Sequence, residues 1–538
     1  MADSRLLRGT FLLTAATFIA KFLGMISVFP LHALIGEQGG ALYSYAYIPY
    51  SITLSIATLG IPLAVSKFVS KYNAIGDYET GRRLFRSGLK VMGLMGLLSF
   101  VALYMLAPWI APLVINGDTF SADDVTYVIR MVSVALIIVP AMSLVRGFFQ
   151  GYQSMGPSAA STAMEQLVRV IFMLVGAYIA LFWFNSSLVT AVGVATFAAF
   201  IGAIGGLFTL VYFWKKRRLG SIKKSTSAAK VPLDEMYKEL IRYAIPFVFV
   251  GLAVPLFQLV DMFTFNRTLA AANYEGDSNA LFSAFTLYNH KLIMIPVSLA
   301  TGFALNLIPT VTSAFTANKL KDVQRYMTQA FQVILFLITP ASLGLSVLAE
   351  SAYASFFDVN EQFDSYAQIL RWYAPAALLY ALYTVSTALL QGINRQKVAM
   401  LSLAIGFIIK CILNVPFLYW FDAIGSVLAT MIGFSSAVFF NLYAIHRSTG
   451  YRFRQLVKRF ILILVICSIM VIAVVLWSSA LAVWFPIESS RLNAIIVLGS
   501  GVAIGALLYF LISLRIGLME KVLGSQILKK LRLPTRGA

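Results

Sequence analysis

The residues of this 538-residue sequence that could do chemistry are charged side chains placed inside long apolar runs. Six lie deep in such runs, four basic and two acidic: Lys21, Arg169, Lys291, Lys410, Glu165 and Asp261. A charge at the centre of a hydrocarbon layer costs at least about 2.5–3.5 kcal/mol on insertion scales, so each must have a partner or face a water-filled cavity. Because basic residues outnumber acids, we expect a cationic cavity, whose natural cargo is an anion.

The deep charges divide by whether an opposite charge lies within reach on the same helix. Glu165 and Arg169 are four residues apart, so they share a helix face and can pair with each other in a structural or coupling role. Lys21 and Lys291 have no such acid, so we expect them to bind the anion in the cavity. Three polar neighbours favour a water-accessible face around Lys291: Asn289, His290 and Asn306. Asn289 and His290 are also expected to bind the anion.

Seven further basic residues lie within about two turns of the end of an apolar run, where long side chains usually reach the interface. Two of these, Lys67 and Arg146, are further candidates for the anion site. The three histidines and two cysteines are scattered and match no familiar zinc spacing, so we expect no metal and no cofactor. A membrane-embedded glycosyltransferase or phosphatase would need clustered acids or histidines, so we expect no enzyme.

Fourteen apolar runs must position these residues. The chain is 59% hydrophobic and 12% charged, whereas soluble domains average roughly 45–50% apolar and about 25% charged residues. A helix needs roughly 20 apolar residues to cross a bilayer, and the absence of two-residue alternation excludes a barrel. The sequence predicts an all-α polytopic membrane protein with spans at residues 11–35, 42–70, 88–115, 125–150, 159–184, 188–214, 241–267, 281–315, 327–350, 366–391, 398–419, 423–446, 460–484 and 492–514.

Basic residues alternate between the predicted connections. Of the 42 lysines and arginines, 30 lie in the two tails and the even-numbered connections, and one, Arg491, lies in an odd-numbered connection. Positive loops stay cytoplasmic, so both termini are predicted to be cytoplasmic. The same placement accounts for the net charge of +20, because anionic lipids attract basic connectors. Nucleic acid is therefore not an expected partner.

The sequence carries an internal repeat across a basic connector. The pair Gln150-Gly151 ends the fourth run, and Gln391-Gly392 ends the tenth. The same offset relates Arg169 to Lys410. We therefore predict two six-helix bundles with the same orientation, a transporter arrangement. The predicted domains are a first bundle at 1–214, a basic cytoplasmic connector at 215–240, a second bundle at 241–446, and two additional spans with a basic cytoplasmic tail at 447–538.

These features resemble the multidrug/oligosaccharidyl-lipid/polysaccharide exporter superfamily, and within it the polysaccharide biosynthesis and stage V sporulation B branch. Residues 21–24 (Lys-Phe-Leu-Gly) match a basic-x-Leu-Gly element of the MurJ-type (YtgP-like) lipid II flippases. Residues 288–292, followed by Pro296, match their Tyr-x-x-Arg-Leu element. The resemblance implies that undecaprenyl-pyrophosphate-linked peptidoglycan precursor (lipid II) is flipped in the bacterial cell membrane by alternating access. It also implies that basic cavity residues hold the pyrophosphate and that the tail lies in a groove formed with the last two helices.

The anion site departs from the family pattern. Lys21 and Lys291 replace arginines, which keeps the charge but loses the bidentate fork for phosphate. Ser27 stands where well-studied Gram-negative-type members have a second arginine, and no basic residue lies between Tyr43 and Ser66 on the second helix. The anion site is expected to be thinner than theirs or differently placed.

Some members bind sodium between the seventh, eleventh and twelfth helices. Here Asp261 is on the seventh run, and Lys410 and Asn414 are on the eleventh. We therefore hypothesise that the Lys410 ammonium takes the place of the cation and pairs with Asp261, which would make activity insensitive to sodium.

Other cargoes and functions stay open. A capsule, teichoic-acid or sporulation-specific polyprenyl-linked glycan would use the same fold. A multidrug cation antiporter is less favoured, because it needs buried acids in the first half, where only Glu165 qualifies. A structural role as a membrane-protein scaffold is the last alternative. The expected partners are an anionic lipid-linked oligosaccharide precursor, the bilayer and cell-wall synthesis proteins, and the membrane potential is the expected driving force.

Overall fold

The computed structural model describes residues 2–523 except for residues 59, 75, 116–118, 217–235, 239–244, 246–247 and 358. Within these, only the backbone is described for residues 2–12, 14, 61–64, 67, 74, 303, 305, 306 and 523. The regular elements of the described residues are all helices, and eleven helical stretches among them are long and apolar enough to cross a membrane. The chain is therefore an all-helical multi-pass membrane protein, as predicted.

The chain divides into two compact units, Met1–Ala270 and Ala271–Ala538. The sequence prediction assigned the seventh run to the second bundle, whereas in the structure its helix packs into the first unit. The side-chain amide of Asn266 explains this placement, because it donates to the Tyr45 hydroxyl (2.5 Å) and to the Val114 carbonyl oxygen (3.2 Å), both in the first unit.

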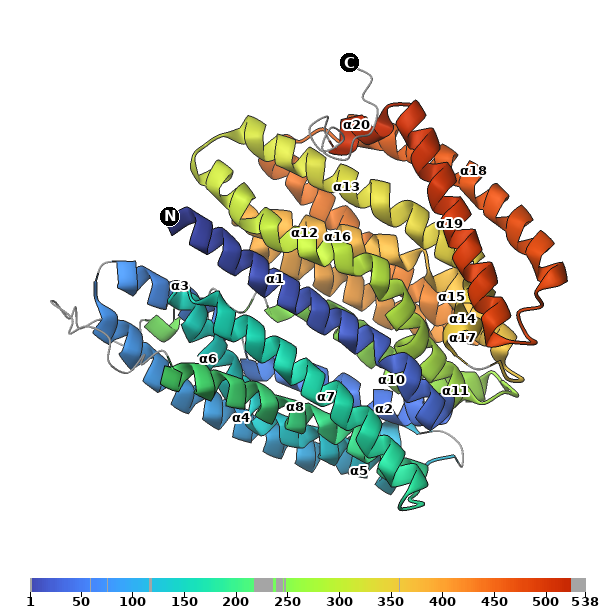
Figure 1. Ribbon diagram of the computed structural model, residues 1–538, viewed down its shortest axis with the longest axis horizontal. Helices are drawn as coiled ribbons and strands as arrows, with labels where there is room; N and C mark the ends of the chain where they lie inside the picture. Colours follow the sequence, from blue (N-terminus) through green and yellow to red (C-terminus); the bar gives the residue numbers. More distant parts are fainter. Residues whose placement is uncertain are drawn as a thin grey trace. The chain divides into compact units, whose positions relative to one another are not determined.

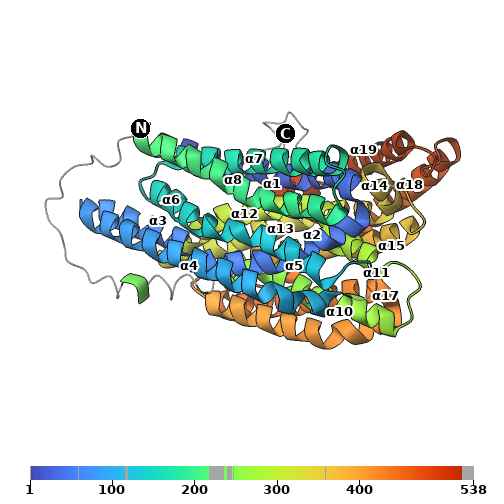
Figure 2. The same cartoon turned by 90° about the horizontal axis from the view of Figure 1, so that it is seen from below.

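The first unit is built from one 3₁₀ turn and nine helices within the described residues (Figures 1 and 2). They are α1 (Ala2–Ile26), α2 (Val28–Thr58), α3 (Ile61–Ala74), α4 (Tyr78–Val114), α5 (Ala122–Ser133), η1 (Val134–Ile137), α6 (Val139–Gly151), α7 (Met155–Phe182), α8 (Leu188–Lys216) and α10 (Ala253–Ala271). Helices α7 and α8 run side by side, and α1 packs along α7. A backbone kink at Gly36 (φ 62°) bends α2, so the first two predicted runs meet at this residue.

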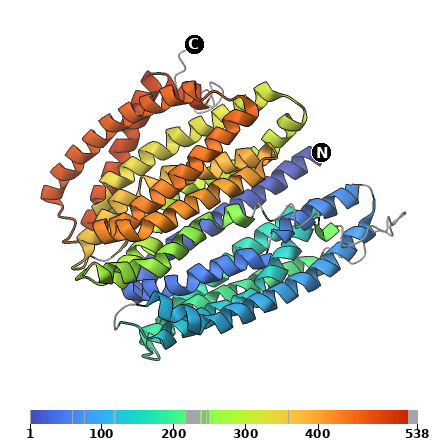
Figure 3. The same cartoon turned by 180° about the vertical axis from the view of Figure 1, so that it is seen from behind.

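The second unit follows the same all-helical plan, with one π-helical turn (Figures 1 and 3). Its elements are α11 (Ser278–Ser283), η3 (Ala284–Asn289, the π-helical turn), α12 (His290–Thr316), α13 (Leu320–Val347), α14 (Ala349–Phe356), α15 (Phe363–Tyr373), α16 (Ala376–Gly392), α17 (Gln396–Thr449), α18 (Arg454–Trp484), α19 (Arg491–Arg515) and α20 (Leu518–Leu523). Helix α17 reverses at Phe421 and Asp422, where Asp422 has a φ of 49°. Its two halves correspond to the eleventh and twelfth predicted runs.

The surfaces of several helices are apolar, as expected where lipid is the solvent. Helices α18 and α19 pack against each other and against α13 and α14 (Figure 1). They expose many large aliphatic side chains. Helix α4 likewise exposes a row of large apolar residues that includes Trp109, which is 76% exposed. Aromatic residues of this kind are enriched at membrane interfaces.

The internal repeat appears as the same close helix contact in each unit. A Cβ atom added to Gly151 at the end of α6 would lie 2.7 Å from the Val69 Cβ on α3. A Cβ atom added to Gly392 at the end of α16 would lie 2.9 Å from the Val311 Cβ on α12. The glycines of the two repeated Gln-Gly pairs therefore let two helices approach closely at equivalent places.

Candidate functional site

A polar cluster joins three helices of the first unit. The Arg146 guanidinium on α6 donates to the Glu165 carboxylate on α7 (2.6 Å) and to the Ser161 hydroxyl (2.8 and 3.0 Å). Ser161 in turn donates to the carbonyl oxygen of Gly206 on α8 (2.9 Å). The two charged side chains are only 16% and 21% exposed, so this ion pair is largely shielded. Arg146 is therefore engaged in holding α6, α7 and α8 together.

The expected pairing of Glu165 with Arg169 is wrong for this structure. Arg169 instead turns to α2, where its guanidinium donates to the Tyr47 hydroxyl (3.0 Å) and lies 5.3 Å from the centre of the Tyr47 ring. Tyr43 stacks on Tyr47 with their ring centres 5.5 Å apart. A planar guanidinium gains from both contacts, hydrogen bonding and stacking over an aromatic face. Glu165 and Arg169 share a helix face, but each bonds to a residue of a neighbouring helix instead, Glu165 to Arg146 and Arg169 to Tyr47.

Lys21 has no ion-pair or hydrogen-bond partner among the described residues. It lies on α1, and its side chain is exposed. In the described part of the chain, no carboxylate or hydrogen-bond acceptor lies within bonding distance of its ammonium group. Gly24, one turn later in the same motif, lets α1 approach α7, because an added Cβ atom would lie 2.9 Å from the Gln166 amide nitrogen. The motif therefore places a basic side chain one turn before a close contact between α1 and α7.

Two of the three polar residues near Lys291 are buried in packing and do not face a wet surface, and the side chain of the third, Asn306, lies outside the described residues. Asn289 is fully buried and its amide donates to the Tyr366 carbonyl oxygen (2.9 Å). His290 is 7% exposed, and its Nδ1 lies 3.0 Å from the Tyr373 hydroxyl. Helix α15 supplies both partners, so these two side chains are used in packing. Lys291 itself is partly exposed.

A π-helical turn sets the direction of these side chains. The turn η3 runs from Ala284 to Asn289, immediately before α12. The extra residue per turn rotates the following helix relative to a regular one, and such turns are frequent at functional sites. Lys291 is the second residue after this turn, so the turn changes its rotation about the helix axis relative to the residues before Ala284. The sequence prediction treated this stretch as one regular helix and missed the turn.

Lys410 is fully buried and coordinated by oxygen atoms of the second half of α17. Its ammonium group donates to the Ser426 carbonyl (2.9 Å), the Ser426 hydroxyl (3.0 Å) and the Thr430 hydroxyl (2.8 Å). Three donors thus meet three acceptors, which satisfies the ammonium. Asn414 lies one turn later and is also fully buried, and Asp261 on α10 is 1% exposed. The pairing of Asp261 with Lys410 stays a prediction.

The structure therefore divides the predicted site residues by environment. Lys21 is exposed and Lys291 is partly exposed, whereas Arg146 has protein partners. Lys67 lies on α3, but its side chain is outside the described residues. The partners that sequence reasoning missed are hydroxyl groups on facing helices: Tyr47, Ser161, Tyr373, Ser426 and Thr430. Nothing in their local sequence distinguishes them from the other hydroxyl residues of apolar helices.

Comparisons with known proteins agree with this architecture. A family model described as polysaccharide biosynthesis protein matches residues 6–315, and a model described as MatE matches residues 246–416. The lipid II flippase MurJ of Bacillus subtilis (strain 168) is 45% identical to this chain over 532 residues, covering 98% of each. Stage V sporulation protein B of the same organism is 25% identical and covers 76% of this chain and 77% of its own length.

The fold also matches a solved structure. The structure described as lipid II flippase MurJ in an inward closed conformation superposes with a TM-score of 0.67, at 16% identity, over 95% of this chain and 99% of its own. This likeness shows a shared fold, and the resemblance inferred from the motifs is confirmed by the 45% identity above. The chain belongs to the polysaccharide biosynthesis protein family and is a homologue of the lipid II flippase MurJ.

Proposed function

We propose that this chain is a multi-pass cell-membrane flippase that moves lipid II from the inner to the outer leaflet. The observation that carries the proposal is the 45% identity over 98% of both chains to a protein named as a lipid II flippase. The activity is transport, not enzymatic catalysis, and it needs only two conformations that bind the cargo differently.

The finer membrane topology is part of the proposal: fourteen spans with both termini in the cytoplasm. Two of the eleven apolar helical stretches contain a sharp turn, at Gly36 and at Asp422, so each holds two predicted spans. The seventh predicted span, 241–267, lies partly outside the described residues. These three positions account for the difference between eleven and fourteen. The basic residues of the even-numbered connections support the cytoplasmic placement of the termini.

The pyrophosphate of the cargo is proposed to be bound by Lys21 and Lys291. What supports this is the exposed side chain of Lys21, which has no acidic partner among the described residues, and the partial exposure of Lys291. Lys67 stays in the proposed set, while Arg146, Asn289 and His290 are proposed to shape the site through their packing rather than by direct binding. An inside-negative potential favours outward movement of an anion by about 2.3 kcal/mol per elementary charge per 100 mV.

Lys410 is proposed to take the place of a coupling cation. Its ammonium group has three oxygen atoms at 2.8–3.0 Å, the kind of oxygen cage that a sodium ion would otherwise need. A fixed positive charge in that cage removes the need for the ion, so flipping should be insensitive to sodium. A strong and specific dependence on sodium would contradict this part of the proposal.

Another polyprenyl-linked glycan is the second candidate cargo. A sporulation-specific cargo is the form of this alternative that a relative's name supports, because stage V sporulation protein B is 25% identical over 76% of this chain. Enzymes that make the precursor and those that polymerise it would be the partners of either flippase, since its cargo is the product of the first and the substrate of the second.

A complementation experiment tests the function and the anion site together. The endogenous lipid II flippase of a bacterium is depleted, and the wild-type chain, Lys21→Ala and Lys291→Ala are expressed at equal levels. Lys319→Ala is a matched control, because Lys319 lies outside the long apolar runs, at the start of α13. Rescue by the wild type and the control, with failure of both site variants, is the expected result. Lys21→Arg should also rescue, since it keeps the charge.

The outcomes separate the parts of the proposal. Rescue by the wild type and by all three alanine variants would keep the cargo and discard the two lysines as anion ligands. Absence of rescue by the well-expressed wild type would reject lipid II and favour another polyprenyl-linked glycan.

A further inference from the structure

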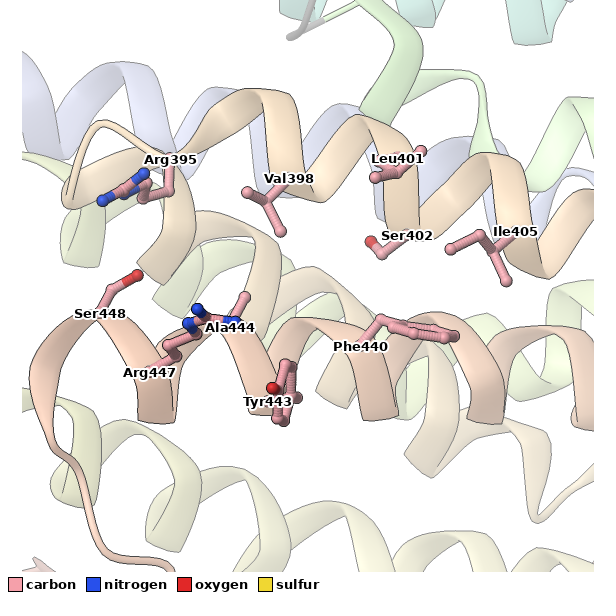
Figure 4. Close-up of a pocket in the computed structure, with 10 residues that line it drawn as sticks. All are labelled: Arg395, Val398, Leu401, Ser402, Ile405, Phe440, Tyr443, Ala444, Arg447 and Ser448. Atoms are coloured by element: carbon pink, nitrogen blue, oxygen red, sulfur yellow. The ribbon is translucent and has the colours of Figure 1, made fainter.

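A pocket between the two halves of α17 combines basic and apolar walls. It has a volume of about 340 Å³ and is lined by residues of this helix pair and by Arg395, which directly precedes α17 (Figure 4). Arg395 and Arg447 lie at one end, and Leu401, Ile405 and Phe440 lie along the other (Figure 4). The polar and apolar parts are thus separated along the length of the pocket.

The two arginines have no anionic partner among the described residues. In the described part of the chain, neither guanidinium has a carboxylate or a hydrogen-bond acceptor within bonding distance, and both side chains are exposed. No acidic residue lines the pocket. An arginine presents a rigid fork of donors that matches phosphate oxygens. Two such groups without a protein anion, at the same end of one pocket, favour an anionic phosphate ligand.

The remaining walls fit the rest of a lipid. Leu401 is 59% exposed and Phe440 is 39% exposed, so the apolar wall is open along the helix surface. Tyr443, which is 53% exposed, lies between this wall and Arg447, where an aromatic side chain suits the boundary between headgroup and acyl chain. A soluble phosphate compound would gain nothing from this open apolar wall, whereas an acyl chain would.

The base of the pocket is held by hydrogen bonds. Ser402, which lines the pocket from the first half of α17, donates to the Asn441 side-chain oxygen on the second half (2.6 Å). The Asn441 amide then donates to Ser386 (3.0 Å) and Thr387 (3.1 Å) on α16. All four side chains are buried. The spacing of the two pocket walls is therefore fixed, which favours a specific site over a transient gap between helices.

We propose that this pocket binds an anionic glycerophospholipid of the cytoplasmic leaflet, with the phosphate between Arg395 and Arg447 and one acyl chain over Leu401, Ile405 and Phe440. The leaflet follows from the proposed topology, since both arginines lie at predicted cytoplasmic ends of their spans. Basic pockets between membrane helices on this side are known to bind anionic lipid headgroups. The lipid would brace the two halves of α17 and is distinct from the transported cargo.

The test is a binding measurement that does not depend on transport. The purified full-length chain is titrated in detergent with phosphatidylglycerol or with phosphatidylcholine, and bound lipid is counted by native mass spectrometry. The double variant R395Q/R447Q removes both charges, and Ala444→Phe fills the pocket while keeping them. Lys397→Gln is the matched control, because it removes a basic charge from the same end of α17 without lining the pocket.

The wild type and Lys397→Gln should bind phosphatidylglycerol about tenfold or more tightly than phosphatidylcholine. R395Q/R447Q should lose this preference, and Ala444→Phe should weaken the binding of both lipids at this site. Equal affinity of the wild type for the two lipids, or an unchanged preference in R395Q/R447Q, would overturn the proposal. A double variant that binds phosphatidylglycerol normally but loses undecaprenyl diphosphate would also overturn it, by assigning the pocket to the cargo.

Discussion

The repeated glycine contact gives the sharpest stability prediction. Gly151→Ala would place a Cβ atom 2.7 Å from the Val69 Cβ and 2.9 Å from the Ser66 carbonyl oxygen. Non-bonded carbon atoms prefer about 3.5–4.0 Å, so the overlap is about 1 Å. Val69 is fully buried and β-branched, and the other atom belongs to the backbone, so neither can rotate away.

The expected magnitude follows from two opposing terms. Inserting a methyl group into a packed contact costs about 1–3 kcal/mol. Alanine has a higher helix propensity than glycine, which stabilises a helix interior by up to about 1 kcal/mol and stabilises a helix end such as Gly151 by less. Gly151→Ala should therefore lower the free energy of unfolding by about 1–2 kcal/mol.

The assay is thermal unfolding of the purified protein in detergent, followed by complementation of a flippase-depleted strain. Gly93→Ala on α4 is the control, because its Cβ atom would meet nothing within 4 Å. Gly392→Ala tests the equivalent contact in the second unit, where the closest atoms are 2.9 Å away and the Ile308 carbonyl oxygen is 3.4 Å away. The order of destabilisation should be Gly151→Ala, then Gly392→Ala, then Gly93→Ala, with the control unchanged or slightly stabilised.

A second-site substitution tests the cause. Val69→Gly removes the Val69 Cβ atom together with its methyl groups, so the double variant should be less destabilised than the sum of the two single variants. The reasoning is refuted if Gly151→Ala melts at the same temperature as Gly93→Ala, or if the two substitutions are simply additive.

Three further predictions concern buried polar contacts. Glu165→Gln should destabilise the first unit by about 1–3 kcal/mol, because it leaves the shielded Arg146 charge without its carboxylate. A double-mutant cycle with Arg146→Met should give a non-zero coupling energy between the two residues. A coupling energy of zero would contradict the ion pair. Lys410→Met should cost about 1.5–3 kcal/mol through the lost charged hydrogen bonds and the unpaired oxygens, measured as a lower melting temperature. Tyr373→Phe should cost about 1–3 kcal/mol by leaving the His290 ring without its partner, and a melting temperature equal to that of the wild type would count against this contact.

The helices of the membrane fold could be predicted from local sequence because the bilayer imposes a length and a composition on every span. Runs such as 460–484 and 492–514 are apolar throughout and correspond to α18 and α19. The turn at Asp422 separates two runs that the sequence also separates, because a charged residue interrupts the apolar stretch there. The grouping of helices was harder, since the placement of α10 depends on hydrogen bonds from Asn266 to distant residues.

The candidate site was predicted less completely than the fold. The sequence determined which residue types enter the membrane, because a charge among apolar residues is conspicuous and costly, and it thereby singled out Lys21, Lys291 and Lys410. Only the tertiary structure decided which charges are satisfied within the protein. Arg146 meets Glu165 across two helices, and Lys410 meets oxygens across the turn of α17. Hydrogen bonds depend on distances and directions between helices, and such geometry is absent from the spacing of residues along one chain.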